Sequence, residues 1–278
     1  MSATSETQKL DSSRIAQAAQ LLVRSRTNGT HLTGLSPELM PGVLSEAYEI
    51  QAAVARLRAT DDAAFKLGLT SESAQRAADT YAPIVGRLGA TEVHRGDTRI
   101  ELPPGHLRVV EAEIVFEVGS DLRAAHAPFS ERRVFASLCA AFAGIELCDT
   151  RFAGSDDWPI ALVVADNSNA DRLVVGDRLT NADLYALSNS SVTLELGGKR
   201  LVRGNTGNVL GHPLRAVTWL ANWLARRGEG LRKGQLISSG SCTGLTEAAA
   251  KDIVVATFGS GARVILELAQ RAPTKVRV

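Results

Sequence analysis

Apolar residues recur along this chain with two different spacings. The first eighty residues show the 3.6-residue period of amphipathic helices. One helix is predicted to begin at Asp11 or Ser12 and another at Ser45, followed by a short strand over residues 64–70 and a short helix capped by Ser71. The apolar faces consist of Ile15, Ala18, Ala19 and Leu22 in the first helix and Ala47, Ile50, Val54 and Leu57 in the second. This part is expected to be mainly helical.

From about residue 98 onward the pattern becomes that of strands. Two helices interrupt it: Ser130 caps one that is predicted to end at Gly144, and Pro213 begins one that stops at Gly228. The strand-like runs are TRIEL, VEAEIVFEV, GIELCD, IALVVAD, RLVVG, VTLEL, QLISS, DIVVATF and ARVILEL. Strands this numerous, without a helix between each pair, favour a mixed α+β fold over a doubly wound one.

The polar face of VEAEIVFEV, residues 110–118, is acidic. Glu111, Glu113 and Glu117 lie on it, and like charges side by side repel unless water or a cation neutralises them. In a half-exposed antiparallel strand the three glutamates would simply face water. Alternatively Glu111 and Glu113, roughly 6 to 7 Å apart along the strand, converge on a hard cation that prefers oxygen ligands. Glu146, in the later run GIELCD, would then be the third donor.

Two charged residues have a second interpretation each. Glu146 could be a core glutamate that pairs with a cation such as Arg151, since burial of an unpaired carboxylate is unfavourable. Lys66, in AAFKLGLTS, could be a surface lysine that extends its ammonium group to water. It could also be a partly desolvated ammonium that binds or protonates an anionic, oxygen-rich substrate.

Composition narrows the classes of function. The 278 residues are 45% apolar and 22% charged, and the formal net charge of +1 gives no general attraction to nucleic acid or to an anionic membrane. Three cysteines without a C-x-x-C pair fit a reducing compartment, and the polar N-terminus has no apolar signal core, so a cytoplasmic protein is expected. The sequence contains no glycine-rich nucleotide motif and no histidine zinc motif. Nucleotide cofactors and zinc hydrolysis are therefore unsupported.

Several long blocks resemble one enzyme family. They are FKLGLTSESAQ (65–75), VEAEIVFEV (110–118), IELCDTRF (145–152), VVADNSNA (163–170) and VLGHPLRAVTWLANWLARRGEGLRKGQLISSGSCTG (209–244). In this order they resemble the 2-keto-4-pentenoate hydratase family, which includes 4-oxalocrotonate decarboxylases and belongs to the fumarylacetoacetate hydrolase superfamily. The resemblance extends from about residue 12 to residue 268.

The resemblance implies a fold and a site. The fold would be an α+β β-roll or sandwich of the fumarylacetoacetate hydrolase type, with an N-terminal helical subdomain (residues 1–80) and a metal-binding catalytic domain (residues 81–278). The cofactor would be Mg²⁺ or Mn²⁺, and the partner a small 2-oxo acid substrate. The implied residues are Glu111, Glu113 and Glu146 as metal ligands, Lys66 as the catalytic lysine, and Ser241, Thr243 and Asp149 for substrate binding. A homo-oligomer is also implied, and some members associate with another enzyme of their pathway.

Two departures leave the reaction open. Ile84 stands where the family commonly has an acidic residue, and Asn169 stands where a D-N-A-S block has its serine. A metal-dependent hydratase acting on a 2-hydroxypentadienoate-type substrate is the leading hypothesis. The alternatives are a 2-oxo acid decarboxylase, a C–C hydrolase or tautomerase of the same superfamily, and a catalytically impaired metal-binding partner subunit.

Overall fold

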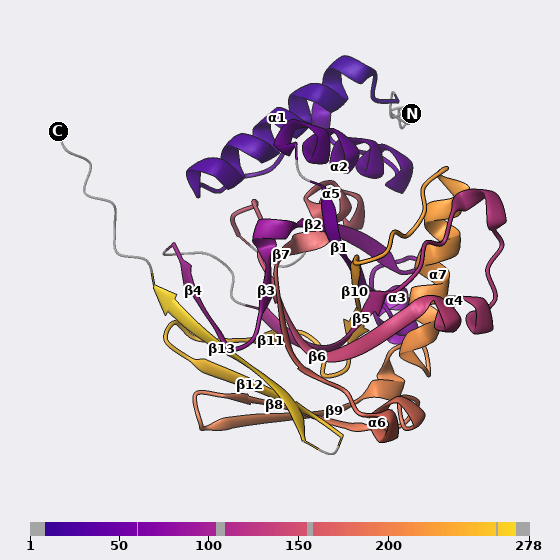
Figure 1. Ribbon diagram of the computed structural model, residues 1–278. Coiled ribbons are helices and arrows are strands. Elements are labelled where there is room, and N and C mark those ends of the chain that lie inside the picture. Colours follow the sequence, from indigo (N-terminus) through magenta and orange to yellow (C-terminus); the bar gives the residue numbers. More distant parts are fainter. Residues whose placement is uncertain (1–8, 60, 104–108, 155–157, 260, 271–278) are drawn as a thin grey trace. The chain divides into compact units, whose positions relative to one another are not determined.

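The computed structural model describes residues 9–59, 61–103, 109–154, 158–259 and 261–270 (Figure 1). The chain forms two compact units. The first contains Met1–Thr60 and Thr150–Asn169, and the second contains Asp61–Asp149 and Ala170–Val278. Residues 61–80 thus group with the second unit. The proposed boundary at residue 80, after which the catalytic domain would begin, stays a prediction. No helix of the described residues is long and apolar enough to cross a membrane.

The first unit is helical. The carboxylate of Asp11 accepts a hydrogen bond from the Arg14 backbone N–H (2.8 Å) and caps α1, as predicted, while Gly29 ends that helix in the left-handed conformation (φ 62°). The second predicted helix begins one residue before Ser45. The elements of this unit are α1 Ser12–Asn28, η1 Pro37–Leu39, α2 Leu44–Arg58, α5 Ile160–Ala165 and η4 Asn167–Asn169.

The strand predicted for IALVVAD is wrong, because residues 160–165 form the helix α5. Pro159 immediately precedes α5, and the amide of Gln51 in α2 donates to the Val164 carbonyl (3.0 Å). A short, continuously apolar run has no period that separates a buried strand from a buried helix. Packing against α2 within this unit decides in favour of the helix.

The second unit contains two mixed sheets. In its described part, the larger sheet has the order β2-β1-β10-β5-β6-β7-β3, with β11 beside β5, and the smaller one has the order β4-β13-β12-β8-β9. The strands of the larger sheet are β1 Asp62–Gly68, β2 Ile84–Gly89, β3 Val93–Arg95, β5 Val109–Val118, β6 Leu138–Cys148, β7 Ala170–Arg178, β10 Leu236–Ser241 and β11 Thr246–Glu247. Those of the smaller sheet are β4 Thr98–Leu102, β8 Ser191–Leu196, β9 Arg200–Asn205, β12 Ile253–Phe258 and β13 Ala262–Gln270. The predicted α+β architecture is confirmed.

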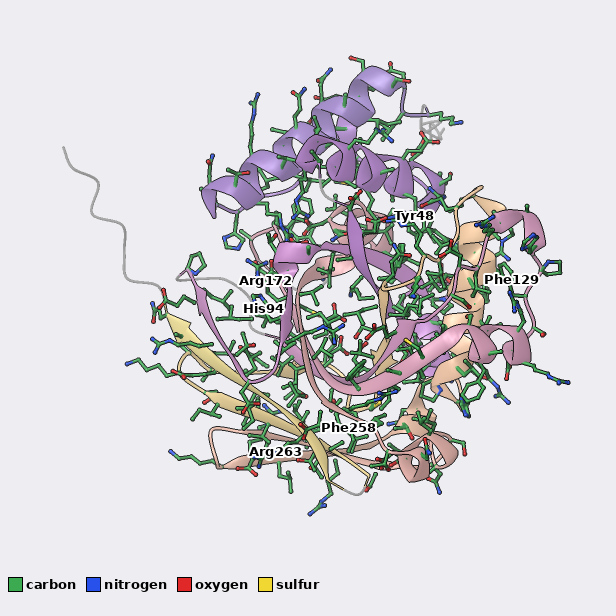
Figure 2. All side chains as sticks on the ribbon, viewed as in Figure 1. Tyr48, His94, Phe129, Arg172, Phe258 and Arg263 are labelled. Carbon is green, nitrogen blue, oxygen red and sulfur yellow. The ribbon has the colours of Figure 1, made fainter. Side chains whose placement is uncertain are left out.

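The two sheets pack closely, and short helices flank them. At Gly176 in β7 an added Cβ would lie 2.4 Å from the Arg263 carbonyl oxygen in β13, so only glycine permits this approach. Phe258 at the end of β12 is among the fully buried side chains (Figure 2). The helices of this unit are α3 Glu72–Ala77, η2 Ala90–Glu92, η3 Ala124–His126, α4 Glu131–Ser137, α6 Asn181–Tyr185, η5 Thr206–Asn208 and α7 Pro213–Arg226.

The helix predicted to extend from Ser130 to Gly144 is only half as long. Ser130 caps α4 as expected, but the helix ends at Ser137 and β6 begins at the next residue. β6 pairs with β5 from Leu138 to Cys148, and this ladder outweighs the helix propensity of the alanines in that segment. The longer strand carries Glu146 into the centre of the sheet.

Strand register determines which side chains meet in the larger sheet. β5 lies between β6 and β10, and Glu111 is directly opposite Glu146 on β6. Glu113 is opposite Ser241 on β10, and β10 in turn pairs in parallel with β1, where Lys66 is beside Ser238. Four adjacent strands therefore bring together residues that are up to 175 positions apart in the chain (Ser241 minus Lys66).

Candidate metal centre

The charged residues of this sheet centre are buried together. Lys66, Glu111, Glu113 and Glu146 come from β1, β5, β5 and β6, and each has at most 8% of its surface exposed. Glu111 and Glu146 form a cross-strand pair, so their carboxylates face the same side of the sheet. The interpretation of Glu111 and Glu113 as a wet strand face is excluded by this burial.

Glu111 and Glu146 share their surroundings with a thiol. One carboxylate oxygen of each glutamate and the Cys148 sulfur all lie within 4.8 Å of one another. The Cys148 Sγ is 3.5 Å from Glu146 Oε1 and 3.7 Å from Glu111 Oε2. Ligand atoms gathered this closely are compatible with binding to a single ion.

Lys66 supplies a positive charge to the same cluster. Its Nζ is 3.1 Å from Glu146 Oε1, and both side chains are almost fully buried. Arg151, the alternative partner considered for Glu146, forms an ion pair with Asp166 within the first unit (Nε to Oδ1, 2.7 Å). The surface-lysine interpretation of Lys66 is also excluded.

Two donors from β10 hold the carboxylate of Glu113 in position. Its Oε2 accepts hydrogen bonds from the Ser238 hydroxyl (2.6 Å) and from the Gly240 backbone N–H (2.9 Å). Its Oε1 is buried and has no hydrogen-bond partner, as is also true of Glu146 Oε2. Orphaned carboxylate oxygens in a dry interior are unfavourable unless a proton or a cation neutralises them.

The electrostatics show an excess of negative charge. Burial, and then the charge of Glu146, raise the pKa of Glu111, and burial with the charges of Glu146 and Glu111 raises the pKa of Glu113 well above its usual value. Burial also raises the pKa of the Cys148 thiol. For Lys66, burial alone would lower the pKa, but Glu146 and its neighbours outweigh this and raise it. One ammonium group does not balance three carboxylates.

The structure separates Glu117 from the cluster. Its carboxylate is 27% exposed and lies 3.3 Å from the guanidinium of Arg95 at the far end of β5. Glu117 is thus a partly exposed residue outside the buried cluster.

Ser241 and Thr243 lie beside the glutamates, whereas Asp149 lies beyond the end of β6. Ser241 is close enough to Glu111 to lower the pKa of that carboxyl, although burial outweighs this effect, and the hydroxyl of Thr243 accepts from the backbone N–H of Ala112, between the two glutamates. Asp149 is buried directly after β6. The substrate-binding roles assigned to these three residues stay predictions.

Ile84 lines the Lys66 side of the site. It is opposite Gly68 on the neighbouring strand, where an added Cβ would lie 3.0 Å from Ile84 Cγ1 and 3.8 Å from Lys66 Nζ. The side chain at position 84 is therefore apolar and supplies no proton donor to Lys66.

Cys148 and Ser238 lie at the site but are not among the residues predicted for it. Cys148 is two residues after Glu146, so the alternation within GIELCD already places it on the same face. Ser238 is recognisable only from the pairing of β10 with β5, since its run QLISS carries no acidic neighbour. The donor set of buried carboxylates with orphaned oxygens fits a divalent cation.

Comparisons with known proteins agree with this fold and site. A 4-oxalocrotonate decarboxylase structure from Pseudomonas putida G7, complexed with magnesium and adipate, superposes with a TM-score of 0.83 at 23% identity, covering 94% of this chain and 99% of that one. A fumarylacetoacetate hydrolase family protein from Yersinia pestis CO92 superposes with a TM-score of 0.53 at 13% identity, covering 74% of this chain and 92% of that one. This chain thus shares its fold with both of these proteins.

Sequence relatives identify the enzyme family. A 2-keto-4-pentenoate hydratase from Burkholderia vietnamiensis is 32% identical over 243 residues, which is 83% of this chain and 88% of that protein. A 4-oxalocrotonate decarboxylase from Pseudomonas sp. strain CF600 is 29% identical over 222 residues, 77% of this chain and 81% of that protein. No family model matches the sequence. The chain belongs to the 2-keto-4-pentenoate hydratase family.

Proposed function

We propose that this protein is a divalent-metal-dependent lyase that hydrates a small unsaturated 2-oxo acid of the 2-hydroxypentadienoate type. The observation that carries the proposal is the burial of Glu111, Glu113 and Glu146 around a single ammonium group. Membership of a hydratase family supports the reaction class. The magnesium complex of the 4-oxalocrotonate decarboxylase from Pseudomonas putida G7 and the buried oxygen donors of this chain together support Mg²⁺ or Mn²⁺ as the cofactor.

Glu111, Glu113 and Glu146 are the residues that would hold the cation. When bound, a divalent cation polarises the 2-oxo group of the substrate as a Lewis acid. Ser238 and Gly240 orient Glu113 through its Oε2, so that Oε1 remains directed into the site. The Lys66 ammonium is positioned to stabilise negative charge that develops on a substrate oxygen. Its raised pKa keeps the proton on Nζ at neutral pH.

Decarboxylation is the second candidate reaction. The apolar Ile84 beside Lys66 cannot order water or move a proton, as an acidic residue at this position could. A 4-oxalocrotonate decarboxylase is also among the relatives. Both reactions need the same electron sink at the 2-oxo group, so the same ligand set would serve either one.

Product analysis distinguishes the two reactions. With Mg²⁺ present, the protein is incubated with 2-hydroxypenta-2,4-dienoate and with 2-oxohex-3-enedioate. Hydration removes the dienol absorbance of the first substrate without release of CO₂, whereas decarboxylation releases CO₂ from the second. If neither substrate reacts with Mg²⁺ or Mn²⁺, the proposed lyase activity is contradicted, and a binding subunit becomes the better explanation.

The substitution Glu113→Gln tests the ligand set with little disturbance of the fold. The glutamine carbonyl can still accept from Ser238 and Gly240, but the charge at Oε1 is lost. We expect the affinity for Mn²⁺ to fall at least about tenfold, measured by titration calorimetry, together with the activity. Glu117→Gln is the matched control on the same strand, because Glu117 forms only a surface pair with Arg95. Equal metal affinity in both variants would contradict the assignment.

The assembly state is a separate part of the proposal. We infer from the habits of the family that the chain forms a homo-oligomer and that it associates with another enzyme of the same pathway. Mass measurement by light scattering of the purified chain, with and without Mg²⁺, tests it. A monomer under both conditions would contradict the inference without affecting the ligand assignment.

A further inference from the structure

Cys148 is the part of the cluster that the proposed function does not use. It is buried, it follows Glu146 by two residues on β6, and its sulfur faces the carboxylates of Glu146 and Glu111. The ladder between β6 and β7 has a register irregularity at Leu147 and Cys148, so the local backbone departs from a regular strand where the thiol enters the site. The position of the sulfur is therefore specific to this end of β6.

The distances fit a shared ion. Two ligands of one tetrahedral ion, with a metal–sulfur bond of about 2.3 Å and a metal–oxygen bond of about 2.0 Å, are separated by about 3.5 Å. The measured separations of Cys148 Sγ from the two carboxylate oxygens are 3.5 and 3.7 Å. A thiol has one proton and can donate it to one carboxylate at a time, whereas one cation can bind all three atoms.

The surroundings contain further donors that lack a partner. Glu146 Oε2 and Glu113 Oε1 are buried without a hydrogen bond. These oxygens are independent of the contacts made by the sulfur, since Cys148 contacts the other oxygen of Glu146. A cation at this position would thus have sulfur and oxygen donors from three residues, with Glu113 beside them.

We propose that Cys148 is a metal ligand, and that this site accepts a thiophilic divalent cation such as Co²⁺ or Zn²⁺ through Cys148 Sγ, Glu111 and Glu146. The proposal rests on the proposed function in that it uses the same cluster. As the metal–sulfur bond forms, the S–H bond breaks and its proton goes to solvent. Thiolate favours Co²⁺ and Zn²⁺, while Mg²⁺ prefers oxygen. Cys148 consequently determines which metals the site prefers.

Cobalt alone is the probe. The full-length, metal-free protein is titrated with Co²⁺, and absorption in the near ultraviolet reports charge transfer from a thiolate ligand. We expect the band in the wild-type protein and its loss in Cys148→Ser. Cys148→Ser should also lower the affinity for Co²⁺ and Zn²⁺ at least about tenfold and leave the affinity for Mg²⁺ unchanged. Cys139→Ser and Cys242→Ser, which alter an exposed and a buried thiol, should retain the band.

The outcomes separate this proposal from the proposed function. If wild-type protein binds Mn²⁺, as seen by electron paramagnetic resonance, but gives no thiolate band with Co²⁺, the role of Cys148 is overturned and the proposed function stands. A band that persists in Cys148→Ser overturns it as well. If the wild-type protein binds no divalent cation, both proposals fail. Because the band is measured on the wild-type protein, poor folding of a variant does not decide the test.

Discussion

Lys66 and Glu146 form a buried ion pair whose two members have different relations to a bound metal. Glu146 would be a ligand, whereas the Lys66 ammonium occupies space next to one of its oxygens, at 3.1 Å, and competes for its charge. The ammonium thus stabilises the carboxylate when no metal is bound, and it would repel a cation bound beside it. Substitution of Lys66 separates these two effects.

Lys66→Met removes that ammonium and keeps an unbranched chain of similar length. Without metal, we expect the variant to lose about 3–5 kcal/mol of the free energy of unfolding, since a buried carboxylate is left without its partner. Mn²⁺ should bind at least as tightly as in the wild type, while kcat/KM falls by about 10²–10³. Denaturant unfolding with and without Mn²⁺ measures the first effect. Equal stability of the two metal-free proteins would contradict this account of the pair.

At the scale of elements, the end of β10 holds Glu113 in place through its backbone. Gly240 has φ 115°, and an added Cβ would lie 2.0 Å from Thr70 Oγ1. We expect Gly240→Ala to lose about 1–3 kcal/mol for the backbone conformation alone, more for the contact with Thr70, and to weaken Mn²⁺ binding because its N–H no longer reaches Glu113. Thermal unfolding and a metal titration measure both effects.

Gly234 provides the matched control for this substitution. It also has a positive φ, 88°, but an added Cβ would meet no atom within 4 Å. Gly234→Ala should therefore show the backbone effect on stability without the loss of metal affinity. If the two alanine variants lose the same stability and both retain metal binding, the contact with Thr70 does not affect stability and the hydrogen bond to Glu113 does not affect metal affinity.

The elements that were predictable from sequence are those with a clear period. Strict alternation in VEAEIVFEV gave both the strand β5 and the face that carries its glutamates, and Asp11 and Ser130 marked real helix starts. IALVVAD has no period, and the segment after Ser137 is alanine-rich yet extended because β5 pairs with it. Cross-strand partners such as Ser238 depend on register between distant strands, which a single sequence does not contain.

At the scale of the whole molecule, metal binding, folding and pH are linked through the carboxylates. The raised pKa values of Glu111 and Glu113 mean that, above about pH 4.5, the metal-free folded state binds more protons than the unfolded state. Its free energy of unfolding therefore falls as pH rises from the unfolded value through the raised folded values. Lys66, whose pKa is raised, stabilises throughout this range and loses its effect only above about pH 10.5.

His94 and His212 change the free energy of unfolding with pH in the opposite direction. Burial lowers their pKa values, so the folded state binds fewer protons than the unfolded state below about pH 6.5 and loses stability as the pH falls. A pH profile of the wild-type protein alone would mix these contributions with those of the carboxylates. Comparison with Glu113→Gln isolates the contribution of one glutamate, since the histidines are the same in both proteins.

Divalent metal should reverse the loss of stability that deprotonation of the cluster causes. A cation binds the ionised carboxylates, so the stabilisation by Mn²⁺ is expected to grow as pH rises above about 4.5 and to reach about 2.7 kcal/mol at a hundredfold excess over Kd. In Glu113→Gln this growth should be smaller, and the metal-free variant should lose less stability than the wild type over the same rise in pH. Denaturant unfolding at a series of pH values, with Mn²⁺ or with a chelator, measures all four curves. A Mn²⁺ stabilisation that is the same at low and high pH, or identical pH profiles for the two metal-free proteins, would show that these carboxylates do not hold the cation.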